Sequence, residues 1–174
     1  MNSAFPNELD TERLVLRQMV ESDWQVLQEH YADVESVRYS IGHVQTPAQS
    51  WRTLAMFAGH WQLKGFGPYT VERKDDQQVL GTVGLWYPPD WVQPELTWAF
   101  VRRFWGQGYA RESARAVLES VRETHPSQQI ISFINRDNAP SIRLATLLGA
   151  QLADAPSGAL DDDWLLFEYP LTQA

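Results

Sequence analysis

The sequence predicts an α/β protein (α+β) with a mixed, mostly antiparallel central sheet of about seven strands and helices on both faces. Short apolar segments with strand periodicity alternate along the chain with longer segments of helical periodicity. Three of the strand-like segments follow one another across turn-rich connections, which indicates an antiparallel meander. A long helix then separates two strand-like segments, and a connection of this length favours a parallel crossover.

The N-terminal part of the chain predicts a strand, a helix and a loop. Apolar and polar residues alternate in Thr11–Arg17, which is typical of a strand. Ser22-Asp-Trp-Gln25 resembles a capping box and predicts the start of a helix. Residues Val37–Thr46 have no clear period, so we expect a loop there.

A second helix is predicted to begin after Thr46. This residue is a suitable N-cap and is followed by Pro47, which favours the first helical position. Trp51 and Trp61 lie on the apolar stripe of this helix, so we expect both to pack in the core. Gly65 is suited to end the helix.

The middle of the chain predicts the meander and the crossover. The expected meander strands are Pro68–Arg73, Val79–Trp86 and Glu95–Val101. Gly106–Thr124 carries a helical apolar face, and Ile130–Ile134 is nearly all apolar, as in a strand covered on both faces. The last of the meander strands and Ile130–Ile134 should therefore be parallel.

The C-terminal part predicts one more helix and two strands. Asn138 and Pro140 mark the start of the helix, and Gly149 marks its end. Gln151–Ala153 and Trp164–Tyr169 are the expected final strands. Neither a repeat nor a linker interrupts the pattern, so we expect a single domain over residues 1–174.

Composition limits the classes of function. The chain contains no cysteine, which excludes disulfides and thiolate nucleophiles. Its net charge of −8 argues against general binding to nucleic acid or to anionic membranes. The sequence has no apolar run of the ~18 residues that a membrane span needs, and no pattern of a secretory signal peptide. We therefore expect a cytoplasmic protein without nucleic acid, membrane or metal as partners.

A glycine-rich turn, Phe104–Ala110, is the first candidate for a binding site. Gly106 and Gly108 permit a tight turn and a close approach of the backbone to a ligand. The amides of the helix that follows lack helical partners, and the helix dipole favours an anion there. Residues 101–145 contain seven arginines and four acidic residues, which also suits an anion. Taken alone, the two glycines are equally consistent with a simple turn.

Several motifs resemble those of one family. Residues 105–110, Trp-Gly-Gln-Gly-Tyr-Ala, resemble the glycine motif of the GNAT superfamily of N-acetyltransferases. Asn138-Ala-Pro-Ser141, followed by Leu148-Gly149-Ala150, resembles its second motif. The opening TERLVLR and the segment Glu95-Leu-Thr-Trp98 resemble the branch that contains the ribosomal-protein N-terminal (Rim-type) acetyltransferases. The resemblance covers nearly the whole chain and implies a GNAT-like acyl-CoA N-acyltransferase fold.

The chain departs from the family pattern at two positions. Trp105 stands where the family commonly has Gln or Arg, which would alter how the glycine turn is held. Ala150 stands where Phe is usual, which affects a packing contact.

The resemblance implies that acetyl-CoA is the co-substrate. Main-chain groups at the end of the strand before the turn would line the pantetheine, and amides of the turn would hold the pyrophosphate. Arg103 or Arg111 could reach a phosphate, although arginines are more often solvated surface residues, and we favour that interpretation for both. The residues implied to bind acetyl-CoA are Phe100, Val101, Trp105, Gly106, Gln107, Gly108, Tyr109, Ala110, Arg111, Asn138 and Ser141.

Catalytic candidates are two side chains. Glu95 is the candidate base, because related enzymes often carry a Glu on this strand near the acceptor; a surface Glu is the alternative. Ser141 is the candidate for protonating the thiolate, although its hydroxyl could instead bond a nearby carbonyl. A main-chain amide near Phe100 is the expected oxyanion donor. Tyr39 and His43, in the expected N-terminal loop, are candidates for binding the acceptor.

Three functions remain open from sequence. The first is an acetyltransferase that acts on a primary amine, either a protein N-terminus or a small molecule. The second is a catalytically silent acyl-CoA-binding sensor, and the third is a domain in which the glycines form only a turn. Exposed strands could pair in a homodimer, although nothing in the sequence requires one.

Overall fold

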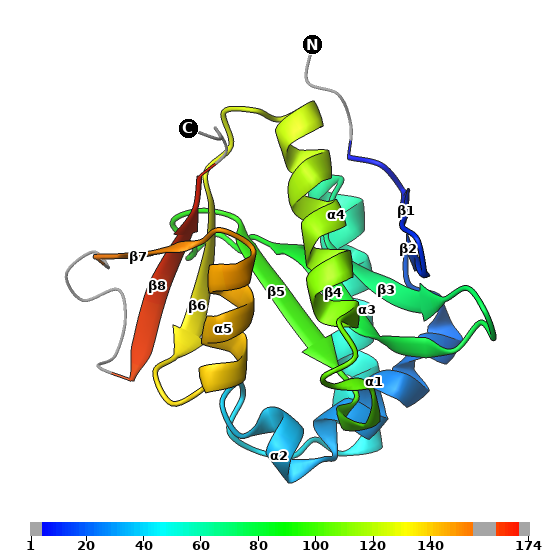
Figure 1. Cartoon of the computed structure of the whole chain (residues 1–174). Helices are drawn as coiled ribbons and strands as arrows, with labels where there is room; N and C mark the ends of the chain where they lie inside the picture. Colours follow the sequence, from blue (N-terminus) through cyan, green and yellow to red (C-terminus); the bar gives the residue numbers. More distant parts are fainter. Residues whose placement is uncertain (1–4, 155–162, 171–174) are drawn as a thin grey trace.

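The computed structural model describes residues 5–154 and 163–170. Within these ranges, eight strands form one sheet in the order β1-β2-β3-β4-β5-β6-β8-β7 (Figure 1). The strands are β1 (Glu8–Asp10), β2 (Leu14–Arg17), β3 (Pro68–Arg73), β4 (Val79–Trp86), β5 (Glu95–Phe100), β6 (Ile130–Asn135), β7 (Gln151–Ala153) and β8 (Trp164–Tyr169). The α-helices are α1 (Trp24–Tyr31), α2 (Val34–Val37), α3 (Pro47–Lys64), α4 (Tyr109–Thr124) and α5 (Ala139–Leu147).

The sheet is mixed, and its neighbouring strands are antiparallel except for β5 and β6. This arrangement confirms the predicted fold class, including the parallel crossover through α4. The described sheet has an additional edge strand, β1, which pairs with β2. With three residues, β1 is too short to show strand periodicity in the sequence.

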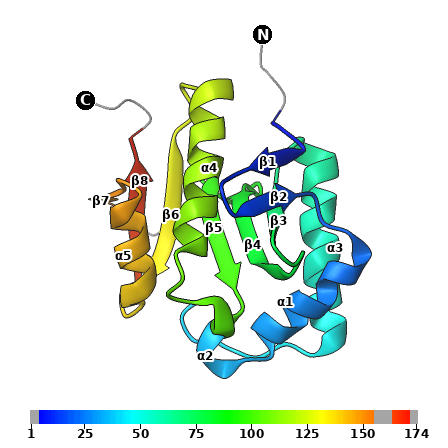
Figure 2. The same ribbon diagram turned by 45° about the vertical axis from the view of Figure 1, so that its right-hand side comes forward.

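Helices cover both faces of the sheet, as the two views show. Helices α4 and α5 lie on one face, and α1 and α3 lie on the other (Figures 1 and 2). The core side of α4 buries Ala114, Val117, Leu118 and Val121, which recur at helical spacing. None of the helices in the described ranges is long and apolar enough to cross a membrane.

The start of α1 differs from the prediction. A single 3-10 turn at Glu21–Asp23 precedes the helix, and Ser22 does not cap it. Asp23 stands at the N-cap position of α1 instead, but its carboxylate makes no cap hydrogen bond to this helix. It accepts from the Val20 amide, before the 3-10 turn, at 3.0 Å and pairs with Arg17 at 2.8 Å. The sequence pattern placed the polar residue correctly to within one position, but it could not show the partner on β2.

Helix α3 confirms its predicted ends and one of its two tryptophans. The Thr46 hydroxyl accepts from the Gln49 amide at 3.3 Å, and Gly65 ends the helix with φ at 74°. Trp61 is buried, whereas Trp51 is 44% exposed, so the prediction that Trp51 packs in the core is wrong. The buried positions of the helix are Ser50, Leu54, Phe57, His60 and Trp61, and Trp51 lies beside this row rather than on it.

Candidate active site

Strands β5 and β6 separate soon after they meet. Their parallel register is limited to one pair, Glu95 with Ile131. One step further, the Phe133 amide donates to Glu95 Oε1 at 3.3 Å, and the Ser132 hydroxyl donates to the Leu96 carbonyl at 2.6 Å. Two side chains therefore take the place of main-chain partners, and a gap opens between the strands (Figure 1).

Main-chain groups of β5 face this gap at alternate residues. The Val101 amide donates to the Leu80 carbonyl at 3.0 Å, so the polar main-chain groups of Val101 face β4. Because the direction alternates along a strand, the main chains of Trp98 and Phe100 face the gap. Phe100 and Val101 are the residues implied to line the pantetheine at the end of this strand. The main chain of Phe100 faces the gap, whereas that of Val101 faces β4. Trp98, which the sequence analysis did not propose as a binding residue, also faces the gap with its main chain.

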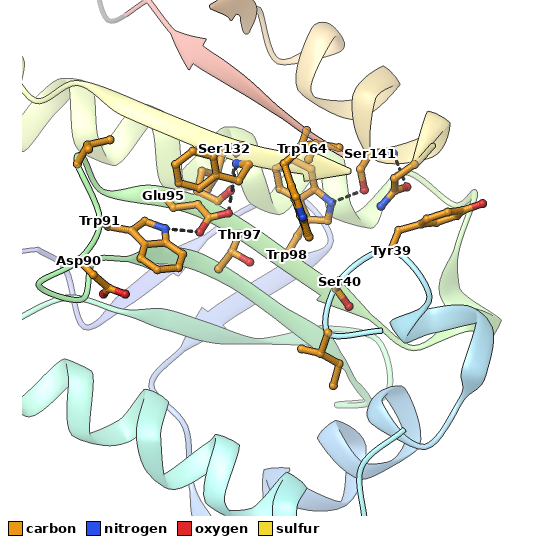
Figure 3. A pocket seen from close by; sticks show the side chains of 16 residues that line it. Tyr39, Ser40, Asp90, Trp91, Glu95, Thr97, Trp98, Ser132, Ser141 and Trp164 are labelled. Atoms are coloured by element: carbon orange, nitrogen blue, oxygen red, sulfur yellow. Dashed lines mark hydrogen bonds between the residues drawn. The ribbon is translucent and has the colours of Figure 1, made fainter. Parts of the chain in front are cut away.

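A cleft of about 660 Å³ fills the space between the separated strands (Figure 3). Such a volume is typical of small-molecule sites. Strands β5, β6 and β8, helix α5, the loop after α2 and the loop before β5 all contribute to it. Its lining residues are Tyr39, Ser40, Ile41, Asp90, Trp91, Val92, Glu95, Leu96, Thr97, Trp98, Ser132, Phe133, Ile134, Asn138, Ser141 and Trp164.

Glu95 lies in the cleft at the point where the strands part. Its Oε2 accepts from the Trp91 indole at 2.7 Å, and its Oε1 accepts from the Phe133 amide (Figure 3). Burial raises the pKa of Glu95 to about 7, although the two hydrogen bonds favour its charged form. A carboxylate that titrates near neutral pH is well suited to proton transfer.

Ser141 and Asn138 reach the cleft from the start of α5. The Asn138 side chain caps the helix by accepting from the Ser141 amide at 3.2 Å. The Ser141 hydroxyl accepts from the indole nitrogen of Trp98 at 3.2 Å. An indole can only donate, so Ser141 accepts in this contact and its own proton remains available for another acceptor. The alternative contact, a nearby carbonyl, is not the one that this hydroxyl makes here.

The glycine turn leads from β5 into α4. Gly106 and Gly108 adopt φ values of 73° and 85°, a region that favours glycine. The Glu112 amide is the first to bond back along the helix, to the Gly108 carbonyl. The amides of Tyr109, Ala110 and Arg111 therefore precede the first helical bond, and such amides bind anions readily.

A hydrogen bond from Trp105 connects the glycine turn to the end of β5. Its indole donates to the Phe100 carbonyl at 2.7 Å, and Nδ1 of the buried His30 lies 3.0 Å from the same oxygen. Burial lowers the pKa of His30, which favours the neutral ring with its proton on Nδ1. The tryptophan at this family position therefore has a specific partner, which the sequence could not reveal.

Arg13 supports the same turn from the N-terminal side and is absent from the sequence-based candidates. Its guanidinium donates to the Gln107 carbonyl at 3.1 Å and to the Glu112 carboxylate at 2.6 Å. It also lies over the Tyr109 ring at 4.5 Å. The opening TERL segment was assigned to the family resemblance, but no local pattern indicates its contact with α4.

The remaining predicted phosphate-binding and acceptor-binding residues differ in whether they lie at the cleft. Arg103 forms an ion pair with Glu29, and Arg111 is exposed in the first turn of α4. Tyr39 lines the cleft. His43 does not line it; the ring is exposed, and its Nδ1 lies 2.8 Å from the carbonyl of Ile41.

Comparisons with known proteins agree with this arrangement. The family described as acetyltransferase (GNAT) domain matches residues 13–151. The N-acetyltransferase YoaA of Bacillus subtilis, named as uncharacterized, is 25% identical over 145 residues, which are 82% of each chain. The crystal structure of an acetyltransferase from Agrobacterium tumefaciens is 25% identical, with a TM-score of 0.83 over 97% of this chain and 96% of that one. A GNAT-family acetyltransferase structure from Bacillus anthracis is 21% identical and shares the fold, with a TM-score of 0.76 over 93% of this chain and 96% of that one.

The family match covers the glycine turn, the gap between β5 and β6, and the start of α5. GNAT domains use acetyl-CoA as co-substrate, and the free amides at the start of α4 suit its pyrophosphate. The chain therefore belongs to the GNAT family of acetyltransferases.

Proposed function

We propose that this protein transfers the acetyl group of acetyl-CoA directly to a primary amine bound in the cleft between β5 and β6. One observation carries the proposal. A carboxylate with a pKa of about 7, Glu95, lies in the same cleft as the hydroxyl of Ser141, whose proton is not used in its hydrogen bond with Trp98. In the proposed reaction, Glu95 is the base for the amine and Ser141 is the donor to the thiolate.

The proposed path of the co-substrate runs from the start of α4 to the start of α5. In the proposed complex, the amides of residues 106–110 hold the pyrophosphate, because they precede the first helical bond of α4. The main chain of Trp98 and the amide of Phe100 face the gap and are available to the pantetheine, whereas the Phe100 carbonyl is already used by Trp105 and His30. Asn138 and Ser141 then lie beside the thioester, at the start of α5. Arg13 holds the turn in shape through Gln107.

The proposed reaction is a direct displacement at the thioester carbonyl. The neutral amine forms the new C–N bond, and one of its protons passes to Glu95, directly or through water. The C–S bond breaks, and the thiolate accepts a hydrogen bond from Ser141 and takes a proton from solvent, relayed through this hydroxyl. Glu95 returns the proton of the amine to solvent, so that free CoA and an amide leave. A thiol with a pKa near 8.5 is a fair leaving group, so Ser141 assists the reaction rather than controls it.

The free energy needed to deprotonate the acceptor depends on the pKa of its amine. An α-amine with a pKa of roughly 7.7–8.0 needs only about 1 kcal/mol to become neutral near pH 7. A lysine, at about 10.4, needs roughly 4–5 kcal/mol. A carboxylate with a pKa of about 7 suits the first of these acceptors better. The segments TERLVLR and Glu95-Leu-Thr-Trp98 also resemble the Rim-type branch. On these two grounds, we include protein N-termini among the proposed acceptor amines.

Calorimetry with acetyl-CoA, combined with a free-thiol assay, tests this proposal. The amine panel contains N-terminal peptides, polyamines and aminoglycosides. We expect acetyl-CoA to bind, and thiol to appear only when an amine of the correct class is added. If acetyl-CoA does not bind, the proposed function is wrong. If it binds and no amine releases thiol, the sensor function replaces it.

A further inference from the structure

The charged side chains that line the described cleft are all acidic. Among the described residues that line it, the charged side chains are Asp90 and Glu95, and none is Lys, Arg or His. Asp90 is exposed at the mouth, in the loop before β5, and Glu95 lies deeper, where the strands part. Arg38, which stacks on Tyr39 at 5.1 Å, also pairs with Glu35, so an acid near it already offsets its charge.

Aromatic side chains form much of the cleft wall, and hydrogen bonds fix two of them. The Trp91 indole donates to Glu95 and its ring meets Phe133 edge to face at 5.9 Å. The Trp98 indole donates to Ser141. Trp164, the first residue of β8, also lines the cleft (Figure 3). Fixed indoles lose little freedom when a ligand binds, and their faces attract cations.

We infer that the acceptor is an ammonium ion on an apolar carbon frame, with no carboxylate or phosphate close to the reacting amine. This rests on the proposed function of the cleft and names the substrate class for it. Trp91, Trp164 and Asp90 receive the cation, and Glu95 then takes its proton.

An anionic group next to the amine is disfavoured by the same residues. A carboxylate brought into the cleft with the amine faces Glu95 and Asp90, and no cationic side chain lines the described wall to pair with it. An unpaired buried charge is costly, and like charges repel. Free α-amino acids and sugar phosphates are therefore excluded, whereas aralkyl amines and neutral N-terminal residues of peptides fit.

Binding to the enzyme–CoA complex tests the inference without depending on how easily each amine loses its proton. The matched probes are 2-phenylethylamine and phenylalanine, which differ by one carboxylate, with 2-phenylethanol as the uncharged analogue. At pH 8, we expect calorimetry to show 2-phenylethylamine binding at least about 10-fold more tightly than either of the others. A Phe-Ala-Ala-amide peptide distinguishes the sources of the cation: tighter binding of the peptide indicates a protein N-terminus, and tighter binding of the free amine indicates a small molecule.

Two variants locate the selectivity in the cleft. Asp90→Asn should weaken amine binding about 3- to 10-fold and reduce the preference over phenylalanine, whereas Asp75→Asn, in the exposed turn between β3 and β4, should change neither. Trp164→Leu keeps an apolar wall but should lower the ratio of amine to 2-phenylethanol affinity about 5-fold.

Clear results would overturn the inference. Phenylalanine binding as tightly as 2-phenylethylamine does, or no binding by any of these probes, contradicts it. So does an unchanged preference in both Asp90→Asn and Trp164→Leu. These outcomes leave the proposed acetyl transfer intact, because acetyl-CoA binding and thiol release with other amines are measured separately.

Discussion

The indole nitrogen of Trp98 donates a hydrogen bond to the hydroxyl of Ser141 at 3.2 Å, joining the middle of β5 to the first turn of α5. This contact crosses the gap between β5 and β6 and decides how the hydroxyl is used. Because the indole occupies an acceptor position of Ser141, the serine proton is free to point toward the proposed thioester.

Removing this hydroxyl should slow the chemical step. We expect Ser141→Ala to lower kcat about 10-fold, because the thiolate loses a hydrogen-bond donor. Trp98→Phe should have a smaller effect of the same sign, since it leaves the hydroxyl without its orienting partner. Steady-state thiol release measures both. Thr146→Ala, on the same helix with a hydroxyl bonded to Ile142, is the control, and an equal loss in this control would contradict the assigned role.

Replacing Glu95 should remove a titration from the rate. Burial raises the pKa of Glu95 to about 7, so its basic form accumulates above that pH, and kcat/KM should rise with pH through 7. Glu95→Gln should lower kcat/KM at pH 7.5 roughly 100-fold and remove this rise, leaving the titration of the amine itself. The exposed Glu168→Gln on β8 is the control. An intact pH profile in Glu95→Gln would show that Glu95 is not the base.

Blocking the glycine turn should weaken acetyl-CoA binding specifically. Gly108→Asp adds a carboxylate at the N-cap of α4, where its Cβ would lie 3.3 Å from the Arg13 guanidinium, and strains a backbone with φ at 85°. We expect its Kd for acetyl-CoA to rise at least about 10-fold, together with a stability loss of about 1–2 kcal/mol. Gly42→Asp introduces the same side chain at φ 73° in open space, so it should show the stability loss alone. Equal Kd values in calorimetry for the two variants would contradict the proposed cradle.

His60 should make stability depend on pH below neutrality. Its Nε2 accepts from the Tyr87 amide at 3.0 Å and its Nδ1 donates to the Phe66 carbonyl at 2.7 Å, so both ring nitrogens are used in the neutral form. Burial lowers the pKa of His60, so the unfolded state binds a proton first as pH falls through about 6.5. The free energy of unfolding should therefore decrease from pH 6.5 downwards, until the pH reaches the lowered pKa of the folded state.

Denaturant unfolding at pH 7.5 and pH 5.5 checks this expectation. In His60→Gln the decrease between the two pH values should be smaller than in the unmodified protein. The pKa of the buried His30 is also lowered, so His30 should account for part of the decrease that remains in His60→Gln. His43→Gln, at an exposed position, should leave the decrease unchanged. An equal decrease in His60→Gln and the unmodified protein would contradict the assignment to His60.

Local patterns predicted the fold well where both partners lie close in sequence. The Thr46 cap, the end of α3 at Gly65 and the glycine turn each depend on neighbouring residues, and each is found where it was expected. Trp51 was wrongly predicted to be buried because the apolar face of a helix is several residues wide. The sequence does not show which edge of that face packs in the core. Strand β1 was missed because three residues do not establish a period.

Contacts between distant segments decide the site, and the sequence could not supply them. Ser141 and Trp98 are 43 residues apart, and Arg13 and Glu112 are 99 apart. Glu95 entered as a candidate from its place on the strand before the glycine turn. Its contact with the Phe133 amide depends on the register of β5 and β6, which no local pattern contains. Trp91 and Trp164 entered the site for the same reason, once the strands were placed.

A single-turnover experiment with isotopically labelled acetyl-CoA tests the central claim most directly. Enzyme in excess is mixed with the labelled thioester and an accepted amine, and the protein, the amine and free thiol are followed together by mass spectrometry and thiol titration. Direct transfer predicts one acetylated amine for each thiol released and no labelled protein at any time. Labelled enzyme that forms before the amide, or thiol release that yields acetate instead of amide, would contradict the account.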